Sequence, residues 1–403
     1  MLSAASRPYI DASVPVLKEH GLAITRHFYG QMLEAQPELR NLFNLGNQAS
    51  GAQQQSLAAA VFAYAANIDN AAALAPVLER IVHKHAAVGI RPAHYPIVGR
   101  HLLAAIQHVL GDAATPALIA AWDEAYWLLA GELIAAEARL YQSTGTVAGA
   151  LQTLRVTRVD DDGEGIRSYY LEREGGGSPG TFQPGQYVSV EAQWPDSGRR
   201  QLRQYSLSDA PNRPYWRITV QRTHEAGSGE LGAVSNWLHE RIQAGDTLRV
   251  SPAFGDFTPQ LAGNAPIVLI SAGVGITPMV SVLNALAAEG STRPIHFLHG
   301  ARSPAQQALR ADLLAAAQAL PSLKISLFYE DGADRAAAEL PAQPGRVDLS
   351  ATLATVAGTD AEFHLCGPLP FMRDQRHALL AAGVAAARIH REVFGPELLD
   401  HLL

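Results

Sequence analysis

The chain has 403 residues, of which 48% are hydrophobic and 17% are charged, and this length predicts two or three domains rather than one. The net charge of −7 comes without any block of basic residues, which argues against nucleic acid and anionic membranes as partners. No stretch is apolar for the length of a membrane span and the N-terminus lacks a signal-peptide pattern, so we expect a soluble, cytoplasmic protein without stable membrane insertion.

Three sequence patterns follow one another along the chain. Only nine of the 34 glycines lie in the first 145 residues, which are rich in alanine and indicate successive amphipathic helices. Short β-rich runs separated by Gly/Pro turns come next, and from about residue 260 apolar runs alternate with helical segments. We therefore predict a multidomain chain with an all-α domain (1–147), an antiparallel β-barrel (148–260) and a doubly wound α/β domain (261–403).

The stretch HKHAAVGI places two histidines close together on one predicted helix. Residues two apart on a helix point about 200° apart, so His83 and His85 cannot face the same ligand. The apolar stripe that includes Leu78 continues onto His85, whereas His83 falls with Glu79 and Arg80 on the side predicted to face solvent. A histidine on an apolar face is a hydrogen-bonded core residue or a ligand, and this helix alone leaves both open.

Three other predicted helices also carry a polar residue on their apolar side. Gln53 extends the stripe of Leu57, Glu137 interrupts the stripe of the last helix, and Tyr29 lies among leucines. A buried amide, carboxylate or phenol costs several kcal/mol when it has no partner. The residues are therefore either scattered caps and half-exposed side chains or members of one polar site. Since the single cysteine, Cys366, rules out a cysteine-based centre, a metal here needs His, carboxylate or a prosthetic group.

These residues, together with FYGQMLEAQPELRNLFN, resemble the globin domain of the flavohaemoglobins. The side chains that the resemblance places around haem b are Phe43 against the porphyrin, His85 as proximal iron ligand, Tyr29, Gln53 and Leu57 on the distal side, and Tyr95 and Glu137 beside the proximal imidazole. It implies that Glu137, braced by Tyr95, pushes electron density through His85 towards the iron. It also implies that Tyr29, helped by Gln53, donates a hydrogen bond to oxygen at the iron.

The ordered set FQPGQYVSV, RQYSL and GAVSNWL resembles the flavin-binding barrel of the ferredoxin-NADP reductase superfamily. Each piece alone is an ordinary strand or helix pattern, and the order of the three is what is specific. The resemblance implies FAD, held by Tyr187 on its adenine side, Arg203 at the pyrophosphate, Tyr205 and Ser206 at the isoalloxazine, Gln204 as a further contact, and a helix from Gly232 to Ser235 whose amides face phosphate.

SAGVGITPM follows an apolar strand and is expected to open a helix. Gly273 and Gly275 permit a tight turn, Thr277 is the expected N-cap and Pro278 suits the first helical turn. The motif alone also fits an ordinary β-to-α loop. Joined to CGPLPFM, it resembles the nicotinamide half of the same reductases, which implies NADH or NADPH. The residues so assigned are Gly273, Val274, Gly275, Ile276, Thr277, Pro278, Cys366, Gly367 and Pro368, with Cys366 also open to a purely structural role.

The ending HREVFGPEL resembles that of the flavohaemoglobins, in which Glu392 and the residues Val393, Phe394, Gly395 and Pro396 return to the flavin. Lys84 either faces that flavin and, with Glu392, tunes the redox balance, or is a solvated helix lysine.

The resemblance covers the whole chain and implies a nitric oxide dioxygenase, which converts NO and O2 to nitrate at a haem reduced by NAD(P)H through FAD. Two alternatives stay open: a haem-based gas sensor or carrier whose reductase resets the iron, and a general flavin or peroxide reductase. The expected partners are the small molecules NO, O2 and NAD(P)H. The sequence does not decide between NADH and NADPH, and a monomer is the default expectation.

Overall fold

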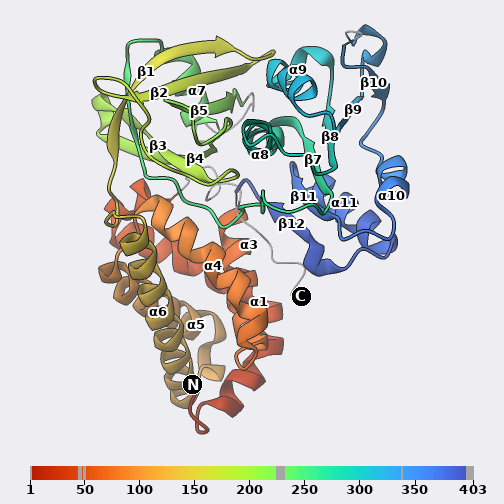
Figure 1. The fold of residues 1–403 in the computed structure, drawn as a ribbon. Helices are drawn as coiled ribbons and strands as arrows, with labels where there is room; N and C mark the ends of the chain where they lie inside the picture. Colours follow the sequence, from red (N-terminus) through yellow and green to blue (C-terminus); the bar gives the residue numbers. More distant parts are fainter. Residues whose placement is uncertain (1, 44–47, 49–50, 224–231, 337–338, 396–403) are drawn as a thin grey trace.

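In the computed structural model, helices form the first third of the chain and two different sheets form the rest. The structure describes residues 2–43, 48, 51–223, 232–336 and 339–395. Figure 1 shows the helical domain below, with the antiparallel sheet above it on one side and the parallel sheet on the other. This succession of all-α, antiparallel β and parallel α/β architecture confirms the predicted fold class.

The helical domain is built from α1 (Arg7–Ala35), η1 (Pro37–Asn41), α3 (Ala52–Ala66), α4 (Ala71–Val88), η2 (Pro92–His94), α5 (Tyr95–Leu110), η3 (Gly111–Ala113) and α6 (Pro116–Ser143). At the start of α4, the Asn70 side chain accepts the amide of Ala73. The helix ends at Gly89, whose φ is 77° and where a Cβ would lie 2.6 Å from the Cα of Gly149. Only glycine fits there, so α4 ends directly against the segment that leads into the first sheet.

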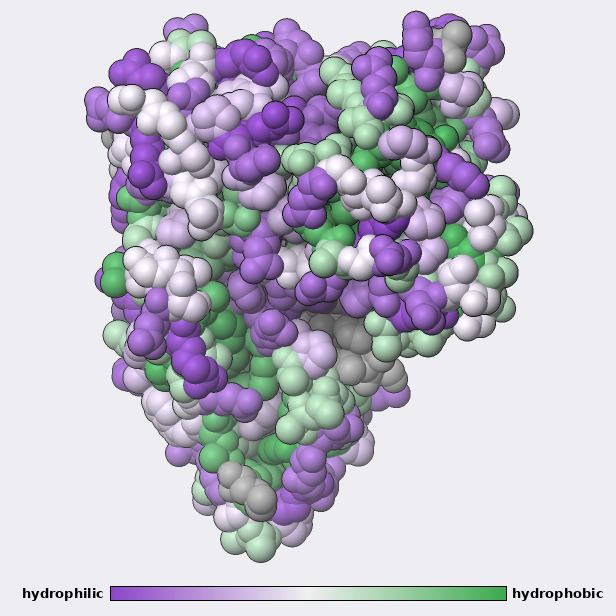
Figure 2. All heavy atoms as spheres, viewed as in Figure 1, coloured by the Kyte–Doolittle hydropathy of each residue, from purple (hydrophilic) through white to green (hydrophobic). Residues whose placement is uncertain are grey.

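The core of the helical domain lies between α1, α5 and α6. Its fully buried side chains include Ile10, Phe28, Met32, Ile106 and Trp122, and burial of each such side chain contributes about 1.5–3 kcal/mol. In the view of Figure 2, apolar side chains are exposed along the middle of the helical domain, and polar and apolar side chains are mixed over the sheet domains. Among the described residues, no helix is both long and apolar enough to cross a membrane.

The antiparallel sheet has the order β4-β3-β6-β1-β2-β5. Its elements are β1 (Gln152–Asp161), β2 (Ile166–Arg173), β3 (Tyr187–Trp194), η4 (Pro195–Ser197), β4 (Arg199–Ser206), β5 (Trp216–Gln221), α7 (Ala233–Arg241) and β6 (Thr247–Val250). The two edge strands β4 and β5 approach each other, and an antiparallel bridge between Leu207 and Ile218 closes the sheet. The interior is filled by alternate residues such as Leu154, Val188 and Val190.

The second sheet is parallel, with the order β10-β9-β8-β7-β11-β12. Its elements are β7 (Ile267–Ala272), η5 (Gly273–Gly275), α8 (Ile276–Ala288), β8 (Ile295–Ala301), η6 (Pro304–Gln306), α9 (Arg310–Ala319), β9 (Leu323–Tyr329), η7 (Ala333–Arg335), β10 (Ala342–Pro344), α10 (Ser350–Val356), β11 (Glu362–Cys366), α11 (Leu369–Ala381), η8 (Ala386–Arg388) and β12 (Ile389–Glu392). Along β7, Ile267 and Leu269 pack with α8 and α9, whereas Val268 and Ile270 pack with α10 and α11. Both faces of this sheet are therefore covered.

Candidate functional site

A buried hydrogen-bonded triad holds His85 inside the helical domain. The Nδ1 of His85 lies 2.8 Å from Oε1 of Glu137 and 3.2 Å from the hydroxyl of Tyr95. The same carboxylate oxygen accepts the Tyr95 hydroxyl at 2.5 Å. Burial, and then the hydrogen bond to Glu137, raise the pKa of Tyr95, so the phenol remains protonated and donates. Helices α4, α5 and α6 each contribute one member, which fixes the imidazole ring and leaves Nε2 for a ligand.

A second polar group lies on α1 and α3. Tyr29 is buried in the core with Leu57 and Phe43 packed against the same cluster, and the rings of Tyr29 and Phe43 meet edge to face at 5.6 Å. Burial raises the pKa of Tyr29 to about 12, while a hydrogen bond with the Gln53 side chain acts in the opposite direction. The predicted distal residues are thus brought together, and the hydroxyl of Tyr29 is a hydrogen-bond donor at any physiological pH.

The expectation that His83 faces solvent is wrong. Its Nδ1 accepts the amide of Gly255 at 2.9 Å, and one turn earlier Nε of Arg80 lies 3.1 Å from Asp256. The Nζ of Lys84 donates to the carbonyls of Val393 and Gly395, both at 3.2 Å. The polar face of α4 therefore contacts the two sheet domains. Periodicity identified this face correctly, but a face that binds another domain has the same sequence pattern as a solvated one.

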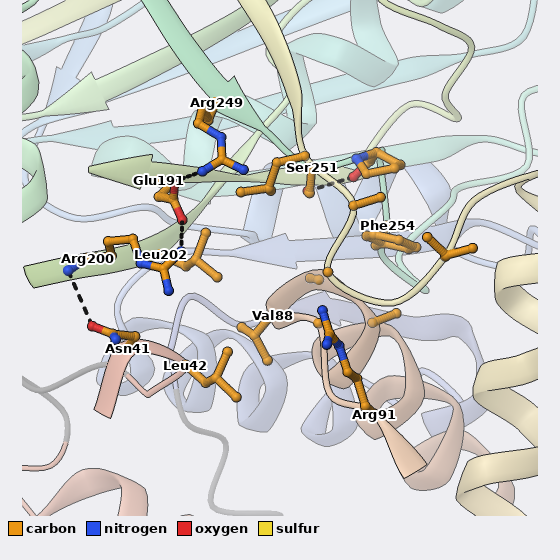
Figure 3. Close-up of a pocket in the computed structure, with 18 of the residues that line it drawn as sticks. Asn41, Leu42, Val88, Arg91, Glu191, Arg200, Leu202, Arg249, Ser251 and Phe254 are labelled. Carbon is orange, nitrogen blue, oxygen red and sulfur yellow. Dashed lines mark hydrogen bonds and ion pairs between the residues drawn. The ribbon is translucent and has the colours of Figure 1, made fainter. Parts of the chain in front are cut away.

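A cavity of about 320 Å³ lies where the end of α4 and η1 meet β3, β4 and β6. In its wall, Glu191 lies 2.7 Å from Arg249 and 3.8 Å from Arg200, whose amide donates to Asn41 of the helical domain at 3.3 Å. Figure 3 shows these side chains on one side of the cavity and Arg91 rising from the helical domain on the other. This part of the contact between the helical domain and the antiparallel sheet is polar and encloses a cavity, whereas Ala86 and Ala87 pack with Tyr187 and Phe254 in a buried apolar cluster.

The residues predicted to hold a flavin lie at one end of the antiparallel sheet. Tyr187 on β3 pairs directly with Ser206 on β4, and the hydroxyl oxygens of both are buried without a hydrogen-bond partner among the described residues. Gly232, with φ 72°, precedes α7, where Ser235 donates to its carbonyl at 3.0 Å. These orphaned hydroxyls, and the start of α7, which has no side-chain cap among the described residues, fit a polar ligand.

Other predicted flavin residues have different surroundings. Arg203 donates to Oε1 of Gln201 and to the Leu202 carbonyl, and Gln204 is exposed. Val393 is buried and Phe394 is 46% exposed. Pro396 lies outside the described residues.

The nucleotide loop Gly273–Gly275 forms a 3-10 turn between β7 and α8. A Cβ on Gly275 would lie 2.3 Å from the carbonyl oxygen of Cys366, so glycine is needed where the two loops meet. The prediction that Thr277 is the N-cap is wrong: α8 begins at Ile276, and the Thr277 hydroxyl donates to the carbonyl of Val274 at 2.9 Å. The loop approaches the helix through a 3-10 turn, which starts the helix earlier than the proline pattern indicates. Pro278 does lie in the first turn, as predicted.

Cys366 is fully buried at the end of β11, in register with Glu392 on β12. Burial, and next the nearby charge of Glu392, raise the pKa of the thiol well above its ordinary value. The thiol is therefore protonated and unsuited to nucleophilic attack. Its backbone carbonyl, which lies against Gly275, shapes the loop more directly than its sulfur does.

The family models match both ends of the chain: globin over residues 26–133 and oxidoreductase NAD-binding domain over residues 269–377. A flavohaemoprotein of Bordetella parapertussis is 50% identical over 400 residues, covering 98% of this chain and 99% of the relative. The chain belongs to the flavohaemoprotein family. The Bacillus subtilis flavohaemoprotein is 38% identical over 401 residues, covering 99% of this chain and 98% of the relative.

Comparison with solved structures agrees with the family found from the sequence relatives. A flavohaemoglobin of Malassezia yamatoensis with bound FAD and haem matches with a TM-score of 0.84 and 31% identity, covering 98% of this chain and all of that one. The FAD/NAD-binding domain of a nitric oxide dioxygenase from Vibrio cholerae matches with a TM-score of 0.54 and 33% identity, covering 61% of this chain and 99% of that one.

The residues of this flavohaemoprotein fit a haem. The described residues contain no cluster of His, Cys, Asp and Glu that would hold a bare metal ion, whereas His85 offers one ring nitrogen and has the other hydrogen-bonded to a carboxylate. This arrangement is typical of a metal-bound histidine. The His85 side chain is 33% exposed, so part of the imidazole is accessible to a ligand.

Proposed function

We propose that this flavohaemoprotein is a nitric oxide dioxygenase that uses NAD(P)H, and that haem b and FAD are its resident cofactors. When bound, the haem supplies an iron at which NO and O2 combine to nitrate, and FAD divides the hydride of NAD(P)H into single electrons. The coarser statement, an oxidoreductase with globin and FAD/NAD reductase modules, follows from the family. The Vibrio cholerae relative, described as a nitric oxide dioxygenase, supports the finer one.

The observation that carries the proposal is the pairing of a hydrogen-bond donor on α1 with the hydrogen-bonded triad of His85, Tyr95 and Glu137. The Tyr29 hydroxyl, held by Gln53, keeps its proton up to about pH 12 and can stabilise negative charge on a bound oxygen substrate. On α6, the carboxylate of Glu137 accepts from Nδ1 of His85 and so increases the basicity of the opposite nitrogen. Together the two groups favour reductive activation of oxygen over its reversible storage.

The polar face of α4 gives the reductase a direct route to this site. Lys84 is adjacent in sequence to His85 and binds two carbonyls of the segment that follows Glu392. We propose that Lys84 and Glu392 adjust the charge around the flavin, since the side chain of Glu392 is buried near Tyr187. A change at the flavin therefore reaches the helix that carries the proximal histidine without crossing solvent.

Peroxide reduction is the second candidate, because a carboxylate hydrogen-bonded to the proximal histidine is also typical of peroxidases. Purified protein loaded with haem and FAD is mixed with NADH, O2 and NO, and nitrate formed is compared with NADH consumed. The dioxygenase predicts nitrate in proportion to NADH. NADH consumption that is independent of NO, without nitrate, would contradict it, and consumption that depends on added peroxide would favour the alternative.

The Tyr29→Phe substitution tests whether the Tyr29 hydroxyl takes part in nitrate formation. We expect nitrate formation to fall roughly a hundredfold, as when one preorganised donor is lost, with the rate of flavin reduction by NADH unchanged. Tyr64→Phe is the matched control, because the Tyr64 hydroxyl donates to the Ala125 carbonyl at 3.2 Å and takes no part in the site. Equal nitrate production by the Tyr29→Phe and Tyr64→Phe variants would remove Tyr29 from the mechanism.

A further inference from the structure

A buried ion-pair network joins the antiparallel-sheet domain to the parallel-sheet domain. Arg217 on β5 is 5% exposed, and its two terminal nitrogens reach Asp312 on α9 at 2.8 and 3.1 Å. Its Nε donates to the Ser208 hydroxyl at 3.1 Å, and it also donates to the Ser208 carbonyl. The guanidinium is thus held from both domains in a planar, two-pronged geometry.

Asn284 on α8 completes the connection. Its amide nitrogen donates to Asp209 at 2.9 Å and to Asp312 at 2.6 Å. Asp209 also accepts the hydroxyl of Tyr215 at 2.8 Å, and its carbonyl accepts the hydroxyl of Ser281 from α8 at 2.8 Å. The carboxylates therefore have partners on strands and helices of both domains.

The cost of such a network suggests what it does. Burying charged groups costs several kcal/mol per ion, and an apolar replacement of similar volume is often as stable. Stability alone therefore does not account for one arginine and two aspartates in the contact. Directional hydrogen bonds, unlike apolar packing, permit only one relative placement of the two domains, and this favours a positioning role.

The network starts next to both predicted cofactor sites. On the flavin side, β4 ends at Ser206, and Ser208 and Asp209 follow directly. On the nucleotide side, α8 begins immediately after the Gly273–Gly275 loop and carries Ser281 and Asn284 on its buried length. Both connections run through rigid elements, so a displacement of the network moves one loop relative to the other.

We propose that Arg217, Asp209, Asn284 and Asp312 are positioning residues that set the distance between the Gly273–Gly275 loop and the Ser206 end of β4, and thereby the approach of the nicotinamide to the flavin. The hydride leaves the dihydronicotinamide with its two electrons and passes to the flavin, so the nicotinamide is oxidised and the flavin reduced, while the network keeps its own protons. The inference rests on the proposed function only in that NAD(P)H reduces the flavin.

The test separates positioning from stability in the full-length protein loaded with haem and FAD. Arg217→Met with Asp312→Leu replaces the ion pair by an apolar pair and leaves Asp209 with Arg213 and its other hydrogen bonds, so its urea midpoint is expected to fall much less than that of Arg217→Met alone. Flavin reduction by NADH, followed anaerobically by stopped flow, is expected to slow at least roughly tenfold, because hydride transfer requires the reacting atoms in near contact. The affinity for NADH should change less than the rate does.

Two further readouts do not depend on turnover. The absorbance of the charge-transfer complex between nicotinamide and flavin should weaken in the double variant, and backbone amides of the Gly273–Gly275 loop should exchange hydrogen faster. Arg249→Met is the control, since Arg249 pairs with Glu191 on the side of the sheet that faces the helical domain. A double variant with wild-type stability, reduction rate and charge-transfer band would overturn the inference.

A conservative single variant keeps the test informative if the double variant does not fold. Asp312→Asn retains the shape and the hydrogen-bonding oxygen, so we expect it to fold and to show an intermediate loss of rate, and a wild-type rate there would count against the proposal. A wild-type protein whose flavin is not reduced by NADH or NADPH would instead refute the proposed function itself, and the two failures are distinguishable.

Discussion

The antiparallel-sheet domain contacts the helical domain through single polar bonds around a cavity and a small apolar cluster of Ala86, Ala87, Tyr187 and Phe254, whereas it contacts the parallel-sheet domain through a largely buried ion-pair network. On the helical side the polar contacts are single bonds, such as Gly255 to His83 and Arg80 to Asp256. On the other side Arg217 and Asn284 are each bonded more than once. We infer that the firm contact serves hydride transfer, in which atoms must meet, and the looser one serves electron transfer, which tolerates distance.

The largest difference should appear in stability. Arg217→Met leaves Asp312 without the charge of Arg217 and the buried Asp209 with only the half-exposed Arg213, 3.4 Å away, and is expected to lower the free energy of unfolding by about 3–5 kcal/mol. Arg200→Met removes a partner of Glu191 that is 52% exposed, and should cost less than about 1 kcal/mol. Urea unfolding followed by the fluorescence of tryptophans, among them the buried Trp216, measures both. Equal losses would contradict the contrast between the two contacts.

Acid should reduce the difference in stability between the wild type and Arg217→Met. Burial alone would raise the pKa of Asp209, but the charge of Arg217 and hydrogen bonds from Ala210, Tyr215 and Asn284 hold it below the ordinary value of 3.8. A carboxylate with a depressed pKa in the folded state stabilises the fold above its ordinary pKa and loses that contribution as pH falls through the folded value. The stability gap between wild type and Arg217→Met should therefore narrow below about pH 4. A gap that is constant down to the acid transition would exclude this role of Asp209.

A smaller effect is expected on the helical side. His83→Leu removes the acceptor for the Gly255 amide. The loss of about 1 kcal/mol corresponds to a roughly fivefold drop in the equilibrium constant for docking of the helical domain on the antiparallel-sheet domain. Haem reduction by NADH should slow by that factor, while flavin reduction, measured in the same stopped-flow trace, should not change. His83→Gln offers an acceptor of similar reach and should restore most of the rate. If leucine and glutamine behave alike, the hydrogen bond has no part in docking.

Salt should produce the smallest effect. The Arg80–Asp256 pair is partly accessible, with 21% and 12% of the side chains exposed, so high ionic strength should screen it. We expect haem reduction to slow by less than about threefold between low and high salt, with no change in flavin reduction, because Arg217 is only 6% exposed and its pair with Asp312 is reinforced by further hydrogen bonds. An equal salt response of the two steps would contradict the distinction.

The positions of His83 and His85 on α4 show what a periodic pattern can and cannot predict. Spacing along the helix separates His85 from His83, because a helix repeats every 3.6 residues whatever surrounds it. The same spacing does not distinguish water from a polar protein surface, so the contact of His83 with Gly255 could not be predicted. At α8 the reverse holds: the glycines marked the loop, but the 3-10 turn Gly273–Gly275 leads directly into the helix, which begins at Ile276, one residue before Thr277.

The interdomain network left only a weak trace in the sequence. Arg217 is a charged residue in the strand pattern YWRITVQR, where an exposed position would be equally natural. Its partner Asp312 lies 95 positions later, and no local rule relates the two residues. Such pairs arise when separate domains fold against each other, so the residues that join the two cofactor sites could not be recognised one motif at a time.

The sequence by itself determined the order of the three architectures, the inward face of α4 and the motifs for haem, flavin and nucleotide, because periodicity, turn chemistry and family resemblance can all be recognised in short stretches of chain. Tertiary structure alone decided that Tyr95 and His85 both hydrogen-bond to one carboxylate oxygen of Glu137. It also decided that Lys84 and His83 contact the two sheet domains and that Arg217 joins the antiparallel-sheet domain to the parallel-sheet domain. These contacts depend on distances across the fold, which the linear order of residues does not contain.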